Sequence, residues 1–186
     1  MKSSGHHANK NDWGGGDFRD LMIGVGHVIE IGVADPDKLG VMGWSYGGFM
    51  TSWVVTHTNR FKAASIGAPV TNLIDFNGTA DITGFLPDYF DGEFWNREKV
   101  YRDHSPLFHI KNAATPSLIQ HGQADARVPL GQGTALYRAL KLRGIETRMV
   151  IYPRAPHGPT EPRQILHLME SNLDWFKSHI PAKQPD

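Results

Sequence analysis

Apolar positions along the chain follow two patterns that alternate with each other. Short apolar runs, typical of buried strands, fall at 39–42, 61–66, 117–120 and 147–152. Segments with helical spacing of apolar residues begin at Asp17, which is expected to cap its helix, and recur over 47–56, 131–142 and 161–179. The alternation predicts an α/β fold, with a mostly parallel sheet of about four strands and flanking helices.

The alternation breaks over residues 71–114, where aromatic side chains stand among Asp, Gly and Asn. A long irregular insertion of this kind is typical of a lid or a pocket wall. A small satellite core beneath a long loop is the alternative. Within the insertion, His104 is expected to begin a short helix. We expect its aromatic side chains to bind substrate, with four candidates: Phe85, Tyr89, Phe94 and Trp95.

The two ends of the chain differ from its middle. Residues 1–16 are polar, contain His6 and His7, and finish in three glycines, so we expect a segment that is flexible or was introduced by cloning. Residues 17–180 are then one domain that includes the insertion, and residues 181–186 are a tail.

Composition excludes several function classes. Lys plus Arg and Asp plus Glu both number 19, so no charge excess points to nucleic acid or to an anionic membrane. The absence of cysteine excludes disulfides, thiol catalysis and cysteine-based zinc sites. No apolar run approaches the ~18 residues that a membrane span needs. We expect a soluble cytoplasmic protein without metal, cofactor, nucleic-acid or membrane partners.

The segment Gly43-Trp44-Ser45-Tyr46-Gly47 lies between a predicted strand and a predicted helix. Its pattern G-x-S-x-G is typical of the sharp turn that exposes a nucleophilic serine. Gly43 and Gly47 are expected to be glycine because side chains there would collide as the chain folds back. The amide of Tyr46, at the start of the helix, is a candidate oxyanion donor.

A serine hydroxyl needs a base to take its proton and an acid to orient that base. Asp125 follows the run at 117–120, and His157 follows the run at 147–152. Because the carboxyl ends of parallel strands meet at one edge of a sheet, Ser45, Asp125 and His157 are expected to converge there as a catalytic triad.

Other polar residues near these positions have alternative interpretations. His121 also ends a strand, but it suits a hydrogen bond that braces the following turn better than it suits the base. Arg127 is expected to pair with a nearby carboxylate. The acids Asp88, Asp91 and Glu93 either meet a substrate amine or are simply solvated.

Together these segments resemble the catalytic domain of the prolyl oligopeptidase family of serine peptidases, especially its acylaminoacyl-peptidase and dipeptidyl-peptidase-like branches. The matching segments, from residue 12 onward, are 13–17, 43–50, 61–64, 105–106, 121–129 and 152–158. The resemblance implies an α/β-hydrolase fold, with Ser45, Asp125 and His157 as nucleophile, acid and base, and the Tyr46 amide as one oxyanion donor.

The resemblance also implies differences from the family. Its members carry an upstream β-propeller and earlier strands, one of which leads into a second oxyanion donor, and this chain resembles only the C-terminal part of the catalytic domain. We therefore expect a truncated α/β-hydrolase fold with an unpaired sheet edge at 39–42, and a homo-oligomer formed through that edge.

Three functions follow from these expectations. The first is hydrolysis of small carboxylic esters, which tolerate a weaker oxyanion hole than amides do. The second is cleavage of short peptides by the same triad. The third is a catalytically silent fragment that binds within a larger assembly.

Overall fold

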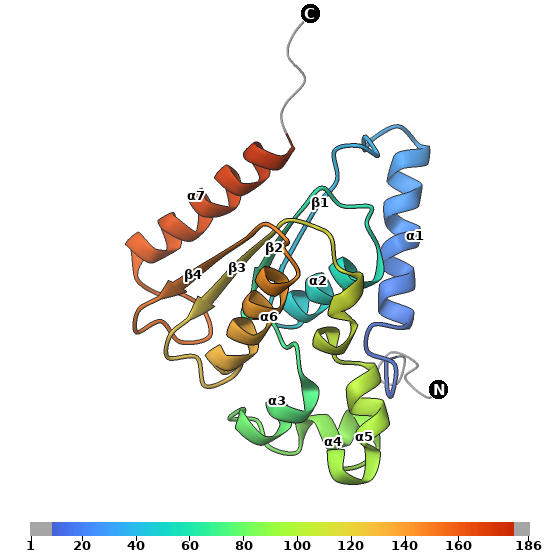
Figure 1. The fold of residues 1–186 in the computed structure, drawn as a ribbon, viewed down its shortest axis with the longest axis vertical. Helices are drawn as coiled ribbons and strands as arrows, with labels where there is room; N and C mark the ends of the chain where they lie inside the picture. The colour runs from blue at the N-terminus through green and yellow to red at the C-terminus, as the bar shows by residue number, and fades with distance from the viewer. Residues whose placement is uncertain (1–8, 181–186) are drawn as a thin grey trace, which may run out of the picture.

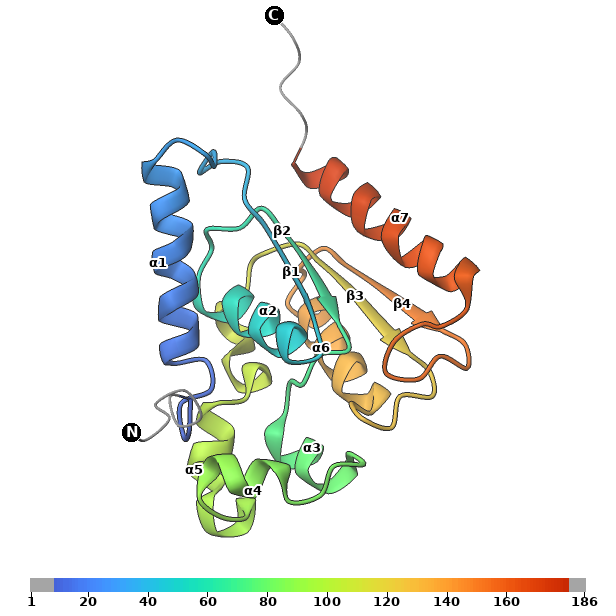
Figure 2. The same cartoon turned by 180° about the vertical axis from the view of Figure 1, so that it is seen from behind.

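The computed structural model describes residues 9–180, and four parallel strands form its single sheet in the order β1-β2-β3-β4 (Figures 1 and 2). Residues 1–8, which include His6 and His7, and the tail at 181–186 lie outside the described residues. The strands are β1 Gly40–Trp44, β2 Ala63–Gly67, β3 Ser117–Gly122 and β4 Thr147–Tyr152. The predicted parallel sheet is confirmed.

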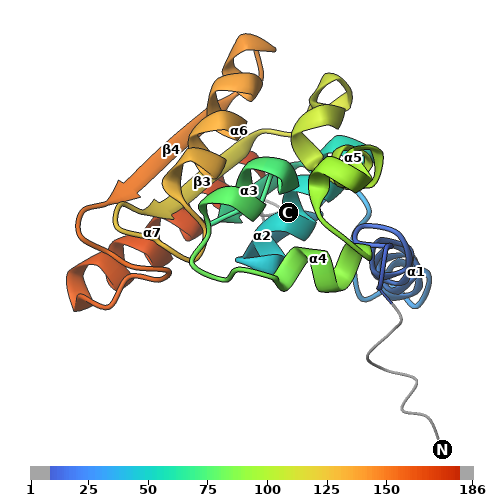
Figure 3. The ribbon, with the colours of Figure 1, turned by 90° about the horizontal axis from the view of Figure 1, so that it is seen from below.

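Helices cover both faces of this sheet, as Figure 3 shows from below. On one face α2 (Tyr46–His57) packs on β1 and β2, and α6 (Leu130–Leu142) packs on β3 and β4. On the other face α7 (Pro162–His179) packs on β2 and β3. Every residue of β2 and β3 is buried as a result, including the polar Gln120 and His121 of β3, which therefore need hydrogen-bond partners inside the protein.

A polar network joins the sheet to α7 through Asn172. Its Oδ1 accepts hydrogen bonds from Ser65 Oγ at 2.5 Å and from Gln120 Nε2 at 2.7 Å. The hydroxyl of Tyr152 donates to Gln120 Oε1 at 2.6 Å, and burial raises the pKa of this tyrosine to about 12. The network fixes the register of α7 on strands that otherwise offer only apolar contacts.

The prediction that residues 1–16 form a flexible segment is wrong for residues 9–16. Trp13 is only 2% exposed, and its ring makes edge contacts with five aromatic rings: Tyr46, Phe49, Phe85, Tyr89 and Phe90. One large indole can fix a polar segment by burying its apolar area, and periodicity does not report such a contact. Helix α1 (Gly16–Glu30) follows, and Asp12 accepts a hydrogen bond from the Gly16 amide at 2.8 Å. Asp17 therefore lies inside the first turn and is not the cap.

The insertion at 71–114 is helical; α3, α4 and α5 lie at the carboxyl end of the sheet, and its last part runs back beside α2 and α6 (Figure 1). Its helices are α3 Leu73–Thr79, α4 Phe85–Phe90, α5 Phe94–Asp103 and the short 3₁₀ helix η1 Pro106–Asn112. His104 follows α5 directly and does not begin a helix; the short helix begins at Pro106. The insertion encloses an apolar core with α2 and Trp13, so the satellite-core interpretation describes its interior correctly.

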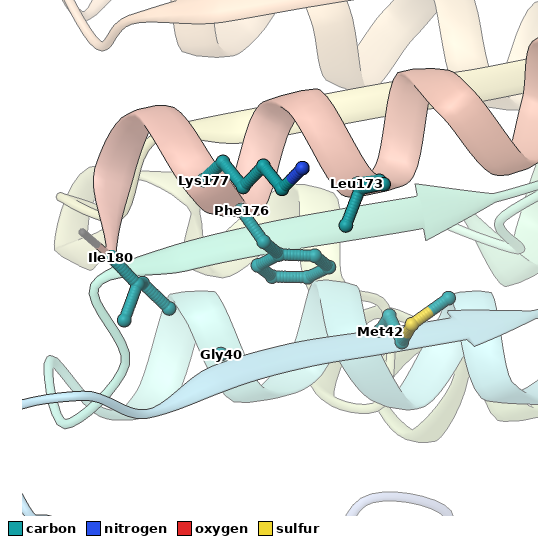
Figure 4. A pocket seen from close by; sticks show the side chains of 6 residues that line it. All are labelled: Gly40, Met42, Leu173, Phe176, Lys177 and Ile180. Atoms are coloured by element: carbon teal, nitrogen blue, oxygen red, sulfur yellow. The ribbon is translucent and has the colours of Figure 1, made fainter. Parts of the chain in front are cut away.

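Strand β1 lies at one edge of the sheet and, among the described residues, pairs with β2 alone. An open groove runs between β1 and α7, lined by Gly40, Met42, Leu173, Phe176, Lys177 and Ile180 (Figure 4). Met42 is 59% exposed. Over residues 9–180, none of the helices combines the length and the apolar character needed to cross a membrane.

Candidate active site

Ser45 sits in the turn between β1 and α2. Its backbone has φ 63° and ψ −119°, a conformation that a residue with a side chain adopts only under strain. Two hydrogen bonds hold the turn: the Ser45 amide donates to Gly67 O at 3.0 Å, and the Phe49 amide donates to Ser45 O at 2.9 Å. The sequence pattern G-x-S-x-G thus corresponds to the strained strand-to-helix turn that it predicts.

Of the two glycines predicted to be required around Ser45, Gly43 is required and Gly47 is not, and Gly48 is required in addition. A Cβ atom on Gly43 would lie 2.4 Å from Gly47 O, and one on Gly48 would lie 2.1 Å from Gly67 O. A Cβ atom on Gly47 would meet nothing within 4 Å. Close backbone approach therefore explains Gly43 and Gly48, while the predicted collision at Gly47 is wrong.

His157 and Asp125 reach Ser45 from the loops that follow β4 and β3. His157 Nε2 lies 2.8 Å from Ser45 Oγ, and His157 Nδ1 lies 2.8 Å from Asp125 Oδ2. The Asp125 side chain is fully buried, and its other oxygen accepts a hydrogen bond from the Val128 amide at 2.9 Å. A carboxylate in this position favours the tautomer with a proton on Nδ1, so Nε2 is free to accept the serine proton.

His121 lies beneath this arrangement and contacts neither Ser45 nor the cavity described below. It is fully buried, and its Nε2–H donates to Val128 O at 2.8 Å, which braces the loop that carries Asp125. Burial lowers the pKa of His121, which favours the neutral ring. The prediction that His121 braces the turn is confirmed.

The side chain and the backbone amide of Tyr46 have different surroundings. Its hydroxyl donates a hydrogen bond to Asp17 Oδ2, and burial together with that carboxylate raises the pKa of Tyr46 far above its usual value. Its amide belongs to the first residue of α2, where N–H groups have no acceptor within the helix. The positive end of the helix dipole adds to the potential at that amide.

A cavity of about 320 Å³ opens beside Ser45 and His157. Its remaining lining is mostly apolar and consists of Trp13, Tyr46, Val70, Phe76, Ile82, Phe85, Arg127 and Val128. The volume suits one apolar side chain or acyl group.

Of the four aromatic residues predicted to bind substrate, Phe85 alone lines this cavity. Tyr89 packs against the ring of Trp13, with 5.3 Å between ring centroids. Phe94 contacts Trp95, which is 65% exposed. The sequence reasoning also missed lining residues, and position was the available signal, since Val70 lies just beyond the end of β2 and Val128 lies just beyond Asp125.

Arg127, which lines the cavity, and two of the acids of the insertion pair with other groups of the chain. Arg127 pairs with Asp81 at 2.5 Å, which confirms its predicted carboxylate partner. Asp91 pairs with Lys10 at 2.7 Å, and Glu93 accepts a hydrogen bond from Asn77 at 3.1 Å. Across residues 9–180, no three His, Cys, Asp or Glu side chains gather where they could hold a metal ion.

The sequence of the chain is similar to those of known serine peptidases. Residues 4–183 match the sequence profile of the prolyl oligopeptidase family. The chain is similar to the uncharacterised peptidase YuxL of Bacillus subtilis, with 41% identity over 93% of this chain and 27% of that protein. It is also similar to the acylamino-acid-releasing enzyme of Arabidopsis thaliana, with 33% identity over 89% of this chain and 23% of that protein.

Solved structures agree with these sequence matches. The acylaminoacyl peptidase of Pyrococcus horikoshii superposes with a TM-score of 0.87 at 28% identity, over 95% of this chain and 30% of that chain. The chain spans about a quarter of the length of the curated relatives it matches.

Proposed function

Because the chain belongs to the prolyl oligopeptidase family of serine peptidases, we propose that it hydrolyses acyl bonds at Ser45 through an acyl-enzyme. The observation that carries this proposal is the continuous chain of contacts from Ser45 Oγ through His157 to Asp125, with 2.8 Å at each step. The cavity beside Ser45 gives the acyl group a place to bind.

The proposed reaction has two stages. Ser45 Oγ attacks the substrate carbonyl carbon while His157 Nε2 takes its proton, and Asp125 stabilises the imidazolium that forms. The tetrahedral intermediate places its negative oxygen at the Tyr46 amide. It collapses as His157 returns the proton to the leaving group, and a water molecule, activated by His157, then releases the acid from Ser45.

We infer that small carboxylic esters are turned over faster than peptides. We assign a single oxyanion donor among the described residues, the Tyr46 amide, and losing one donor typically slows acyl transfer by about 10²–10³. An ester with a good leaving group needs less stabilisation of its intermediate than an amide does. The apolar lining of the cavity favours an apolar acyl group or side chain next to the scissile carbonyl.

A fluorophosphonate probe tests the proposal, because it labels only a serine that its base has activated. We expect the folded protein to be labelled at Ser45, with the label absent from Ser45→Ala and strongly reduced in His157→Gln. No label on protein that circular dichroism shows to be folded would overturn the proposal and favour a silent binding role.

A second measurement separates esterase from peptidase activity. An aryl ester and a peptide anilide with the same acyl part are compared by kcat/KM on one preparation. We expect the ester to be turned over faster, whereas a faster anilide would favour the peptidase activity named for the acylamino-acid-releasing relatives.

A further inference from the structure

Trp44 precedes the candidate nucleophile in the chain and also touches the backbone of the candidate base. Its indole Nε1–H donates a hydrogen bond to the carbonyl oxygen of His157 at 2.6 Å, across 113 residues of sequence. The contact is short and links the turn that carries Ser45 directly to the loop that carries His157. Neither stage of the proposed reaction involves this hydrogen bond.

The loop around His157 has few other backbone restraints. On its upstream side, the Ala124 amide donates to Ala155 O at 2.9 Å, and on its downstream side hydrogen bonds resume at Glu161 O. Among the described residues, the bond from Trp44 is the one hydrogen bond to the backbone of residues 156–160. The position of His157 therefore depends on its own side-chain contacts and on Trp44.

The position of the Trp44 ring is set by its contact with Gly67 of β2. A Cβ atom on Gly67 would lie 2.0 Å from Trp44 Cε3, so the ring lies directly over that glycine. The carbonyl of the same Gly67 accepts the Ser45 amide at 3.0 Å. Gly67, at the end of β2, therefore contacts both Ser45 and the Trp44 indole, which in turn bonds to the backbone of His157.

We propose that Trp44 is a positioning residue, whose Nε1–H holds the His157 backbone so that the imidazole reaches Ser45 and Asp125 together. This inference rests on the proposed function, since it assigns a task within the same site. Loss of the bond frees the loop, and a displacement of about 1 Å at a catalytic group costs up to about 10²-fold in rate.

The test replaces the N–H without changing the shape of the ring. Benzothienylalanine, which carries sulfur in place of the indole N–H, is incorporated at position 44, and 7-azatryptophan, which keeps the N–H, is its conservative counterpart. We expect the sulfur analogue to lower kcat for an aryl ester about 10- to 100-fold with KM within about twofold, and the aza analogue to retain kcat.

Trp175 provides the matched control, because its buried indole N–H has no hydrogen-bond partner among the described residues. The sulfur analogue at position 175 is expected to leave kcat unchanged. Thermal unfolding of each variant shows whether the fold is retained, and Trp44→Phe provides a simpler second variant with the same expected loss of kcat.

Proton NMR reads the position of His157 without any turnover. The Nδ1–H of a histidine bonded to a buried carboxylate resonates far downfield, and His157→Gln assigns that signal. We expect the sulfur analogue at position 44 to broaden or abolish the signal. If the protein with the sulfur analogue at position 44 keeps the kcat of the wild-type protein and also keeps the signal unchanged, the inference is overturned. A wild-type protein that is inactive but shows the signal would contradict the proposed function. The NMR comparison would still test whether Trp44 positions His157.

Discussion

Three glycines next to Ser45 differ in how closely their backbones approach other parts of the chain, so their alanine variants should behave differently. Gly43→Ala and Gly48→Ala place a methyl group within 2.4 Å and 2.1 Å of carbonyl oxygens. We expect each to lower the free energy of unfolding by about 1–3 kcal/mol, as overpacking does. Gly47→Ala meets open space within α2 and should raise it by up to about 1 kcal/mol, through helix propensity.

Urea unfolding followed by circular dichroism measures all three variants. Equal loss of stability in Gly47→Ala and Gly43→Ala would contradict the assignment, because it would mean that both glycines of the G-x-S-x-G pattern are sterically required.

At the scale of single residues, the sequence predicted the three candidate catalytic residues better than it predicted the residues that line the cavity. Ser45, Asp125 and His157 could be placed together because each follows a strand, and parallel strands end at one edge. The lining of the cavity depends on how a helical insertion folds over that edge. Trp13 is remote in sequence and lies in a polar segment, so its pattern did not indicate that it lines the cavity.

At the scale of elements, Gln132 ties α6 to the start of the insertion. It is 1% exposed, its Oε1 accepts the amides of Thr71 and Asn72 at 2.8 Å and 2.9 Å, and its Nε2 donates to Asp75 at 2.6 Å. Gln132→Leu leaves the buried Thr71 amide and the half-buried Asn72 amide without this acceptor, which costs about 1–3 kcal/mol. Because Phe76 of α3 lines the cavity, we also expect a higher KM for the aryl ester.

Thr134→Ala is the matched control on the same helix, since over residues 9–180 the Thr134 hydroxyl bonds to Leu130 O of α6 and to no other group. It should change neither KM nor the unfolding midpoint by a comparable amount. If Gln132→Leu also leaves both quantities unchanged, Gln132 does not anchor the insertion.

A second prediction at this scale concerns His57, which stacks on Trp53 of α2 and faces His109 of η1 with 4.8 Å between ring centroids. Burial and the neighbouring His109 lower the pKa of His57 below its ordinary value of 6.5. The unfolded chain therefore binds a proton more readily than the folded chain. Stability from this group is complete above about pH 6.5 and declines as the pH falls below that value.

Urea unfolding at pH 8, 6.5 and 5 measures this decline. His57→Gln is expected to lower stability at pH 8, through loss of the stack, and to flatten the fall toward pH 5. The slope that remains belongs in part to His121, whose pKa burial also lowers. An unchanged slope in the variant would show that His57 does not contribute to the acid sensitivity.

The elements themselves were predictable where their pattern is long. β4 occurs at 147–152, as the apolar run predicts, and α7 begins within one residue of its predicted start. The helices α3 and α4, of 7 and 6 residues, are too short to form from their own propensity and exist because they pack into the core around Trp13. Such helices carry no periodic signal that sequence reasoning can find.

At the scale of the whole molecule, the sheet is protected unevenly. β2 and β3 are covered on both faces and paired on both sides, whereas β1 presents one edge without a strand partner among the described residues. The groove beside it is lined mainly by apolar side chains, including the exposed Met42 (Figure 4). An open apolar edge of this kind is a template for pairing with another chain.

We propose that the β1 edge pairs with the β1 edge of a second copy, which makes the protein a homo-oligomer in solution. Sedimentation velocity at micromolar concentration should then show a species larger than the monomer.

Met42→Lys places a charge on the edge, a device that natural edge strands use against pairing, and is expected to shift the protein toward monomer. Leu142→Lys is the control, because Leu142 is 90% exposed on α6, away from this edge. A wild-type protein that sediments as a single monomeric species would contradict the proposal, and so would a Met42→Lys variant that associates as strongly as the control.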